Sequence, residues 1–167
     1  GGIPVTLPGA EIFTALQTGA IDATEWVGPY NDRAFGLYKV AKYYYYPGWH
    51  EPGPSIECII NKDAYQSLPE DLKVIVDTAC KAVNIDMLAD YTAKNNIALN
   101  FLKSTNIEIK KFPDDVLKTL REISDSILSD ISSHDEITKE IYLSFTEFRD
   151  NINSWTEISN KSYLNIR

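Results

Sequence analysis

Residues 67–104, SLPEDLKVIVDTACKAVNIDMLADYTAKNNIALNFLKS, decide the fold because they predict one helix of unusual length. Ser67 is a capping residue, and Pro69 suits the first helical turn. A helix of about thirty-five residues would be about 50 Å long, far beyond the usual three or four turns, so it must cross more than one packing unit. Its apolar stripe consists of Leu72, Ile75, Val76, Ala79, Val83, Met87, Tyr91 and Leu99.

The residues before this helix predict an alternation of strands and helices. IPVTLP at 3–8 and IDATEW at 21–26 are predicted to be short strands. The stretches 9–21 and 29–41 are predicted to be helices, the first stopped by a glycine and the second started by a proline. The stretch 43–61, YYYYPGWHEPGPSIECIIN, predicts extended, strand-rich chain. This order indicates the α/β fold class.

The residues after the long helix predict a strand and two amphipathic helices. IEIKKF at 107–112 alternates like a strand, and 113–131 carries apolar residues at helical spacing. A half-sheet built from 1–61 offers too little surface to cover these helices, so they require another lobe or a second copy of the chain. The last helix shows this most clearly, with Ile137, Ile141, Phe145, Phe148, Ile152, Trp155 and Ile158 along one stripe.

These patterns divide the chain into three predicted parts. Residues 1–61 form part of an α/β lobe, 62–104 form a connecting helix, and 105–167 form a strand followed by C-terminal helices. With 167 residues, of which 44% are hydrophobic, the chain is one domain or part of a larger one.

Charge and hydropathy exclude two classes of partner. The net charge is −8, and the lysines and arginines are scattered among more numerous acids, so a nucleic-acid partner is not expected. No apolar run approaches the roughly 20 residues that a membrane span needs, so no membrane insertion is expected. The first residues contain neither an initiator methionine nor a signal peptide, which leaves the compartment open.

The residues that usually carry nucleophilic or redox chemistry are few. Cys58 and Cys80 have neither CxxC spacing nor a nearby histidine, so we expect two buried free thiols rather than a zinc site or a disulfide. His50 and His134 lie near no nucleophile motif, and no glycine-rich phosphate loop is present. An enzyme of these kinds is therefore not indicated.

Two glutamates at the ends of extended segments are the remaining candidates for chemistry. Glu25 follows the stretch IDAT, and Glu51 lies in WHEPG. Ligand crevices of α/β sheets lie at strand ends, and carboxylate and carbonyl oxygens there suit Na⁺ or Ca²⁺. From the residues alone, an acid and base pair for glycoside hydrolysis and simple solvation of two loop ends remain open as well.

The phrases EIFTALQTGAIDATEW and YYYYPGWHEPG, within residues 1–53, carry a specific family resemblance. This stretch resembles the second half of the substrate-binding proteins of tripartite ATP-independent periplasmic (TRAP) transporters, in the branch that binds 2-oxo acids such as pyruvate and related small carboxylates. The resemblance implies half of a two-lobed, periplasmic-binding-protein-like α/β fold, with a long helix that spans both lobes. It also implies a periplasmic solute receptor rather than an enzyme.

The resemblance also implies a site. Glu25, Trp26 and Glu51 would hold a Na⁺ or Ca²⁺ ion that the substrate chelates, and Tyr30, Asn31 and Tyr45 are further candidates for substrate contact. In the family an arginine shortly upstream of GGIPVTLP binds the substrate carboxylate, and this chain starts after that position. We therefore expect the chain to be the C-terminal half of a receptor and to bind ligand weakly or not at all by itself.

The implied partners are a small carboxylate ligand, the TRAP membrane subunits and a second copy of the chain that pairs through the C-terminal helices. Two other functions remain as alternatives. One is a carboxylate-dependent hydrolase that uses Glu25 and Glu51, and the other is a helical protein-interaction module.

Overall fold

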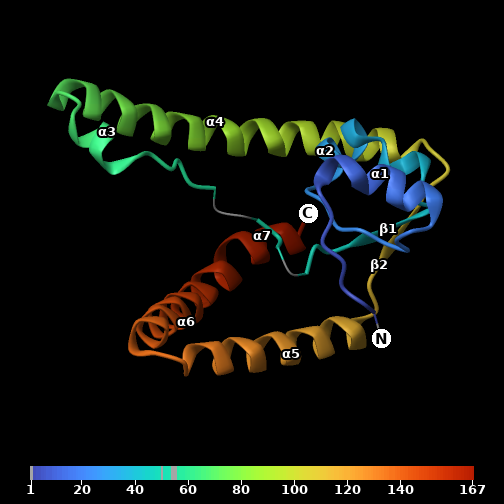
Figure 1. Cartoon of the computed structure of the whole chain (residues 1–167). Helices are drawn as coiled ribbons and strands as arrows, with labels where there is room; N and C mark the ends of the chain where they lie inside the picture. The colour runs from blue at the N-terminus through green and yellow to red at the C-terminus, as the bar shows by residue number, and fades with distance from the viewer. Residues whose placement is uncertain (1, 50, 54–55) are drawn as a thin grey trace. The chain divides into compact units, whose positions relative to one another are not determined.

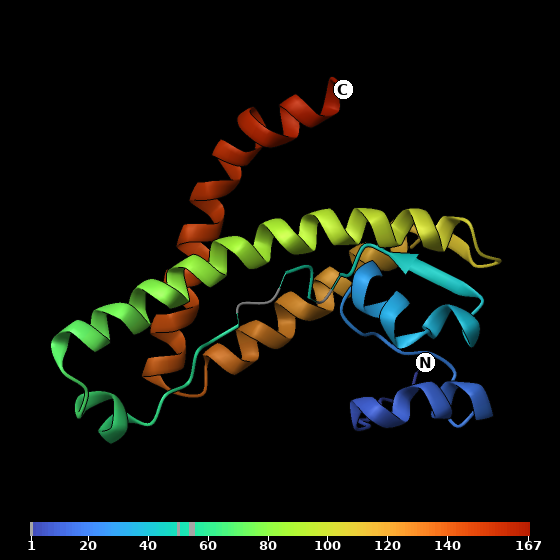
Figure 2. The ribbon, with the colours of Figure 1, turned by 90° about the horizontal axis from the view of Figure 1, so that it is seen from above.

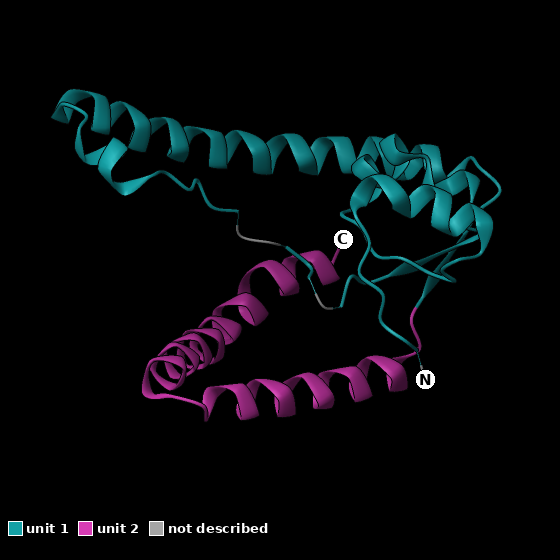
Figure 3. Cartoon of the chain, viewed as in Figure 1, with its two compact units in different colours: residues 1–111 teal, residues 112–167 magenta. Residues whose placement is uncertain are grey.

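A computed structural model describes residues 2–49, 51–53 and 56–167. The chain forms two compact units, Gly1–Lys111 and Phe112–Arg167, which are described separately below (Figure 3). The division into three parts at residues 61 and 104 stays a prediction.

The long helix is confirmed as one uninterrupted element, α4 (Glu70–Lys103), of 34 residues (Figure 1). Pro69 precedes it, acidic residues occupy its first turn and Lys103 its last, as the helix dipole favours. Only the C-terminal part of α4 is buried: Ala98 and Leu102 are each 1% exposed, whereas every residue of 81–90 is exposed. The packing that positions α4 is therefore concentrated in its last three turns.

Helix α2 (Pro29–Phe35) covers that C-terminal part of α4. The Tyr30 amide donates a hydrogen bond to Oδ1 of Asn95 at 2.9 Å, and the Tyr30 ring meets Tyr91 edge to face at 5.8 Å. The Arg33 guanidinium lies 4.1 Å from the ring centre of Phe101. A hydrogen bond from a backbone amide to a side-chain oxygen and two ring contacts thus fix α2 on α4.

Each helix predicted in the N-terminal stretch ends at a glycine. Helix α1 (Gly9–Thr18) ends where predicted, because Gly19 adopts the left-handed conformation with φ 74°. The predicted helix 29–41 is interrupted: α2 ends at Gly36, with φ 78°, and a single 3₁₀ turn, η1 (Leu37–Lys39), follows. Two glycines with positive φ therefore set the C-terminal ends of α1 and α2.

The sheet consists of two parallel strands, β1 (Tyr43–Tyr46) and β2 (Glu108–Lys111), with Tyr43 opposite Glu108. The strand predicted at 107–112 is confirmed, and so is the start of the extended stretch 43–61. The strands predicted at 3–8 and 21–26 are wrong, since neither stretch is hydrogen-bonded into a sheet among the described residues. Alternation predicts an extended backbone, but a strand also needs a partner, and these stretches have none there.

Helix α3 (Lys62–Gln66) connects the extended chain to α4. Its first turn is capped by Asn61, whose Oδ1 accepts from the Ala64 amide at 3.0 Å. The expected burial of Cys58 and Cys80 is wrong: both are exposed and unlinked, because the N-terminal part of α4 has little cover among the described residues.

The second unit contains α5 (Asp114–Ser132), α6 (Glu136–Thr156), a π-helical turn (Glu157–Lys161, η2) and α7 (Ser162–Asn165). Asp135 caps α6 and accepts from the Thr138 amide at 2.8 Å. No residue of 112–167, all of which the structure describes, is buried. The predicted apolar stripe of α6 is uncovered, with Phe148 67% and Trp155 61% exposed. Within 2–49, 51–53 and 56–167, no helix has the length and apolarity of a membrane span.

Hydrogen exchange along α4 tests the uneven packing. We expect the amides of residues 92–102 to exchange at least about tenfold more slowly than those of 76–90, because only the former lie under α2. Mass spectrometry of overlapping peptides from the exchanged chain measures the difference. Equal protection along the whole helix would contradict this account.

Candidate functional site

A hollow of about 840 Å³ lies beside the two predicted site residues Glu25 and Trp26. Its walls are residues 2–7, Ile12 and residues 20–26, so the two stretches that were predicted as strands face it. Both Glu25 and Trp26 line the hollow, and Glu25 is exposed. The structure therefore brings an anionic and an aromatic side chain to one concave surface.

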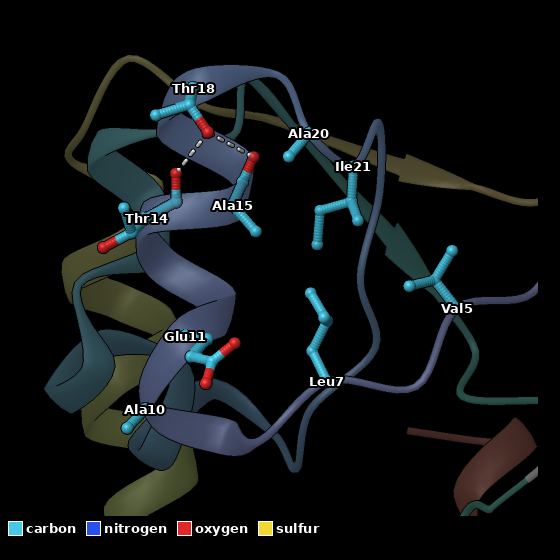
Figure 4. Close-up of a pocket in the computed structure, with 9 residues that line it drawn as sticks. All are labelled: Val5, Leu7, Ala10, Glu11, Thr14, Ala15, Thr18, Ala20 and Ile21. Carbon is cyan, nitrogen blue, oxygen red and sulfur yellow. Dashed lines mark hydrogen bonds between the residues drawn. The ribbon is translucent and has the colours of Figure 1, made fainter.

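A second hollow of about 430 Å³ shares part of this wall and is mostly apolar. In Figure 4, Leu7 and Ile21 point toward one another from two facing segments. Glu11 supplies the carboxylate of this second hollow. The full lining is Val5, Leu7, Ala10, Glu11, Thr14, Ala15, Thr18, Ala20 and Ile21.

The Trp26 indole is held between α1 and α2. It stacks on Phe35 with ring centres 5.0 Å apart and planes 25° apart. A Cβ atom added to Gly9 would lie 2.8 Å from the indole Cη2 atom, so the ring rests directly on the backbone at the start of α1. Trp26 is thus a fixed wall of the hollow rather than a freely rotating side chain.

Asp32 in α2 ties the Glu25–Trp26 loop to the sheet. Its side chain is 7% exposed, and Oδ2 accepts a hydrogen bond of 2.5 Å from the Tyr44 hydroxyl. Its Oδ1 accepts a longer bond of 3.4 Å from the Val27 amide. One buried carboxylate therefore joins α2, β1 and the loop that carries the site.

Burial raises the pKa of Asp32 above its ordinary value, and the negative charge of nearby Glu25 adds to the effect. Hydrogen bonds from Tyr44 and the Val27 amide act in the opposite direction. The pKa of Tyr44 is also raised, first by burial and then by Asp32. Its hydroxyl therefore stays protonated and donates a hydrogen bond to Asp32. The carboxylates of Glu25 and Asp32 lie close enough to repel each other, and a cation beside Glu25 would reduce that repulsion.

Two predicted substrate contacts lie on α2. Tyr30 packs on α4 through Tyr91 and Asn95 and is not among the residues that line either hollow. The Oδ1 atom of Asn31 is buried and has no hydrogen-bond partner among the residues described. A buried oxygen acceptor in this state is suited to a ligand or ion.

The other predicted contacts are not brought to the hollow. Tyr45 is exposed on β1, with its ring 6.5 Å from that of Tyr43, and alternation places it on the face opposite Tyr44. Glu51 is exposed and lines neither hollow. The neighbouring His50 lies outside the described residues.

The described part of the chain does not form a complete cation site. No group of three or more His, Cys, Asp and Glu side chains that would hold a metal is found in it. The oxygen of the Glu25 carboxylate and the Asn31 Oδ1 atom are hard donors of the type that Na⁺ and Ca²⁺ prefer. Glu25 lines the larger hollow, whereas Asn31 is not among the residues that line either hollow.

Sequence reasoning missed the residues that hold the site in place, namely Asp32, Tyr44 and Asn95. The alternation of the tyrosine run was the one available signal, since it separates Tyr44 from Tyr43 and Tyr45. Neither Asp32 nor Asn95 has a neighbouring motif that distinguishes it from a solvated polar residue.

Comparison with known proteins places the chain in a family. Residues 1–135 match the family model described as bacterial extracellular solute-binding protein, family 7. A monocarboxylate 2-oxoacid-binding periplasmic protein of Nostoc sp. PCC 7120 is 40% identical over 160 residues, which cover 96% of this chain and 44% of that protein. The chain thus spans less than half the length of this curated relative.

Two crystal structures of TRAP periplasmic solute-binding proteins are similar. The protein from Colwellia psychrerythraea, with bound calcium and pyruvate, has a TM-score of 0.95 and 37% identity over 100% of this chain and 51% of its own. The protein from Pseudoalteromonas atlantica T6c, with bound sodium and pyruvate, has a TM-score of 0.92 and is 36% identical. The match covers 99% of this chain and 50% of that protein. The predicted fold class, half of a two-lobed α/β binding protein, is confirmed.

Replacing Asp32 with asparagine tests the buried carboxylate. In the folded chain Asp32 keeps its proton at pH values above 3.8, its ordinary pKa, where the unfolded chain has already lost that proton. The free energy of unfolding therefore falls as the pH rises from 3.8 to the raised pKa. We expect the stability of Asp32→Asn relative to the unsubstituted chain to increase over that window, as measured by urea unfolding at several pH values.

The control for this experiment is Tyr44→Phe, which keeps the carboxylate and removes its donor. We expect this variant to be less stable by about 1–3 kcal/mol at neutral pH. A difference between Asp32→Asn and the unsubstituted chain that does not change with pH would contradict the assignment.

Proposed function

The chain belongs to the bacterial extracellular solute-binding proteins of family 7, and we propose that it forms one half of a TRAP-type periplasmic receptor. The receptor binds a small 2-oxo or 2-hydroxy carboxylate together with a Na⁺ or Ca²⁺ ion and delivers the carboxylate to the TRAP membrane subunits. This family consists of binding proteins rather than enzymes.

The observation that carries the proposal is the position of Glu25 and Trp26 on the wall of one hollow. A 2-oxo acid has a carboxylate oxygen and an oxo oxygen spaced for bidentate chelation of one cation. The cation offsets the repulsion between the substrate carboxylate and Glu25. The fixed indole of Trp26 excludes water from one side of the ion, which strengthens these electrostatic interactions.

The cation would take its protein ligands from Glu25, the Trp26 carbonyl and Glu51, as the family resemblance implies. Glu51 follows a segment that leaves β1, so its contribution requires this loop to approach the hollow when ligand binds. Tyr30, Asn31 and Tyr45 stay candidates for substrate contact from the sequence, although none of them is among the residues that line the two hollows. The family resemblance implies that the other lobe of the receptor supplies the arginine that binds the substrate carboxylate and the further ligand of the cation.

Calorimetric titration with sodium pyruvate, with and without Ca²⁺, tests the half-receptor interpretation. We expect the 167-residue chain alone to bind pyruvate weakly or not at all, because it spans about half the length of the receptors that it matches and the resemblance assigns the carboxylate-binding arginine to the other half. Tight pyruvate binding by this chain alone would contradict the proposal.

The function itself is tested in the receptor with both lobes. We expect Glu25→Gln to weaken pyruvate binding at least about tenfold and to reduce its dependence on the cation, because a neutral amide is a poorer ligand for a hard ion. Glu11→Gln is the matched control, since it removes the same charge from the adjoining hollow. Equal effects of the two variants would show that Glu25 does not act through the cation.

The uncovered face of α6 supports a homodimer as the assembly of this receptor. Its stripe is apolar and largely exposed, at 65% for Ile141, 67% for Phe148 and 61% for Trp155. Contiguous apolar surface of this kind is typical of an interface. We place the stripe against a second copy of the chain, across which α6 packs or swaps.

Light scattering of variants of α6 tests the dimer. We expect Phe148→Glu to shift the protein toward monomer, because a charge in the middle of the stripe loses its hydration on pairing. Asn153→Glu adds the same charge away from the stripe and should leave the mass unchanged. A compact monomer before any substitution would argue against the interface.

A further inference from the structure

We propose that Gly9 is a positioning residue for the candidate site, because the lack of a side chain at this position fixes the Trp26 indole and, through it, the loop that carries Glu25. This role rests on the proposed function, in which that loop holds the cation. Gly9 acts without touching the ligand, since it is not among the residues that line either hollow.

The outer edge of the indole meets the backbone of α1 at Gly9. A Cβ atom at this position would lie 2.8 Å from Cη2, 3.3 Å from Cζ3 and 3.9 Å from Cζ2 of Trp26. Real Cβ atoms essentially never come within 3.0 Å of another such atom, so an alanine here would displace the ring. Because the ring is rigid, a displacement of its outer edge moves the whole indole.

The backbone of Gly9 does not itself require glycine. Gly9 is the first residue of α1, and among the described residues only Gly19 and Gly36 have positive φ. Alanine would favour the helix more than glycine does. What the missing side chain supplies at this position is therefore space for the indole.

One face of the same indole is covered by Phe35, which is half-buried in α2. The stacked ring centres are 5.0 Å apart. Figure 2 shows α2 between α1 and the C-terminal part of α4, to which α2 is bound through Asn95. The indole therefore cannot move toward α2 without disturbing a stacked pair on a helix that is itself held in place.

The loop is also held on the side that follows Trp26. The Val27 amide donates a hydrogen bond of 3.4 Å to Oδ1 of Asp32, and a Cβ atom added to Gly28 would lie 3.4 Å from Oδ1 of Asn95. A displaced indole must therefore adopt another rotamer or shift the backbone of Trp26. Either change alters the wall of the larger hollow, to which Glu25 and Trp26 both belong.

The face of α1 that meets the indole also contributes directly to this hollow. Gly9 and Ile12 are three residues apart in α1 and therefore share a helix face. Ile12 is 8% exposed and lines the larger hollow. The start of α1 thus acts on the hollow in two ways, through the side chain of Ile12 and through the absence of one at Gly9.

Nitrogen-15 NMR of the 167-residue chain tests the contact between Gly9 and the indole. The chain contains three tryptophans and therefore gives three indole N–H resonances, and Trp26→Phe identifies the one that belongs to Trp26. We expect Gly9→Ala to shift this resonance and to leave those of Trp49 and Trp155 in place. An unchanged Trp26 resonance would overturn the inference.

Calorimetry on the receptor with both lobes tests the effect on binding. We expect Gly9→Ala to weaken pyruvate binding in the presence of Ca²⁺ at least about fivefold, because the displaced indole disturbs the cation loop. In a Trp26→Phe background the shorter ring leaves room for the added methyl group. The same Gly9→Ala change should there alter the affinity by less than about twofold.

The two backgrounds separate positioning from a general effect on α1. A methyl group that only changed the stability of the helix would act equally in both, so equal effects on pyruvate affinity would overturn the inference. Absence of pyruvate binding by the unsubstituted receptor would contradict the proposed function instead. In that case the shift of the Trp26 resonance decides whether Gly9 positions the indole.

Discussion

The packing of α2 on the C-terminal part of α4 is the contact on which the candidate site depends. Asn95 accepts from the Tyr30 amide, and the same side chain lies against Gly28, where an added Cβ would be 3.4 Å from its Oδ1 atom. The loop with Glu25 and Trp26 precedes Gly28 directly. Because these residues enter α2 at a point fixed by Asn95, the axial position of the long helix determines where the loop lies.

The sequence predicted the helices well and the sheet poorly, for a physical reason. Helical periodicity is local, so the stripe in 67–104 was sufficient to predict α4 as one element. A strand depends on a partner elsewhere in the chain, and the stretches 3–8 and 21–26 have the alternation without the partner. Gly36 has a positive φ and interrupts the helix predicted at 29–41. The sequence did not reveal this break, because glycine also adopts the helical conformation.

The residues of the candidate site were likewise predicted only in part from the sequence. Glu25 and Trp26 were found from a short motif, and they line one hollow. Asp32 was not found, because its importance comes from a hydrogen bond to Tyr44 and from burial, neither of which the spacing reveals. Trp26 was predicted as a contact, but its support by Gly9 became visible only in three dimensions.

The parallel pairing of β1 with β2 has a consequence for how the chain acquires its structure. Tyr43 pairs with Glu108, more than sixty positions later, so the ladder cannot form until the whole of α4 has left the ribosome. Closing so distant a contact is entropically slow, whereas a helix of local contacts forms within microseconds. The N-terminal segments therefore stay unpaired, with apolar side chains exposed, until residues 108–111 are available for pairing.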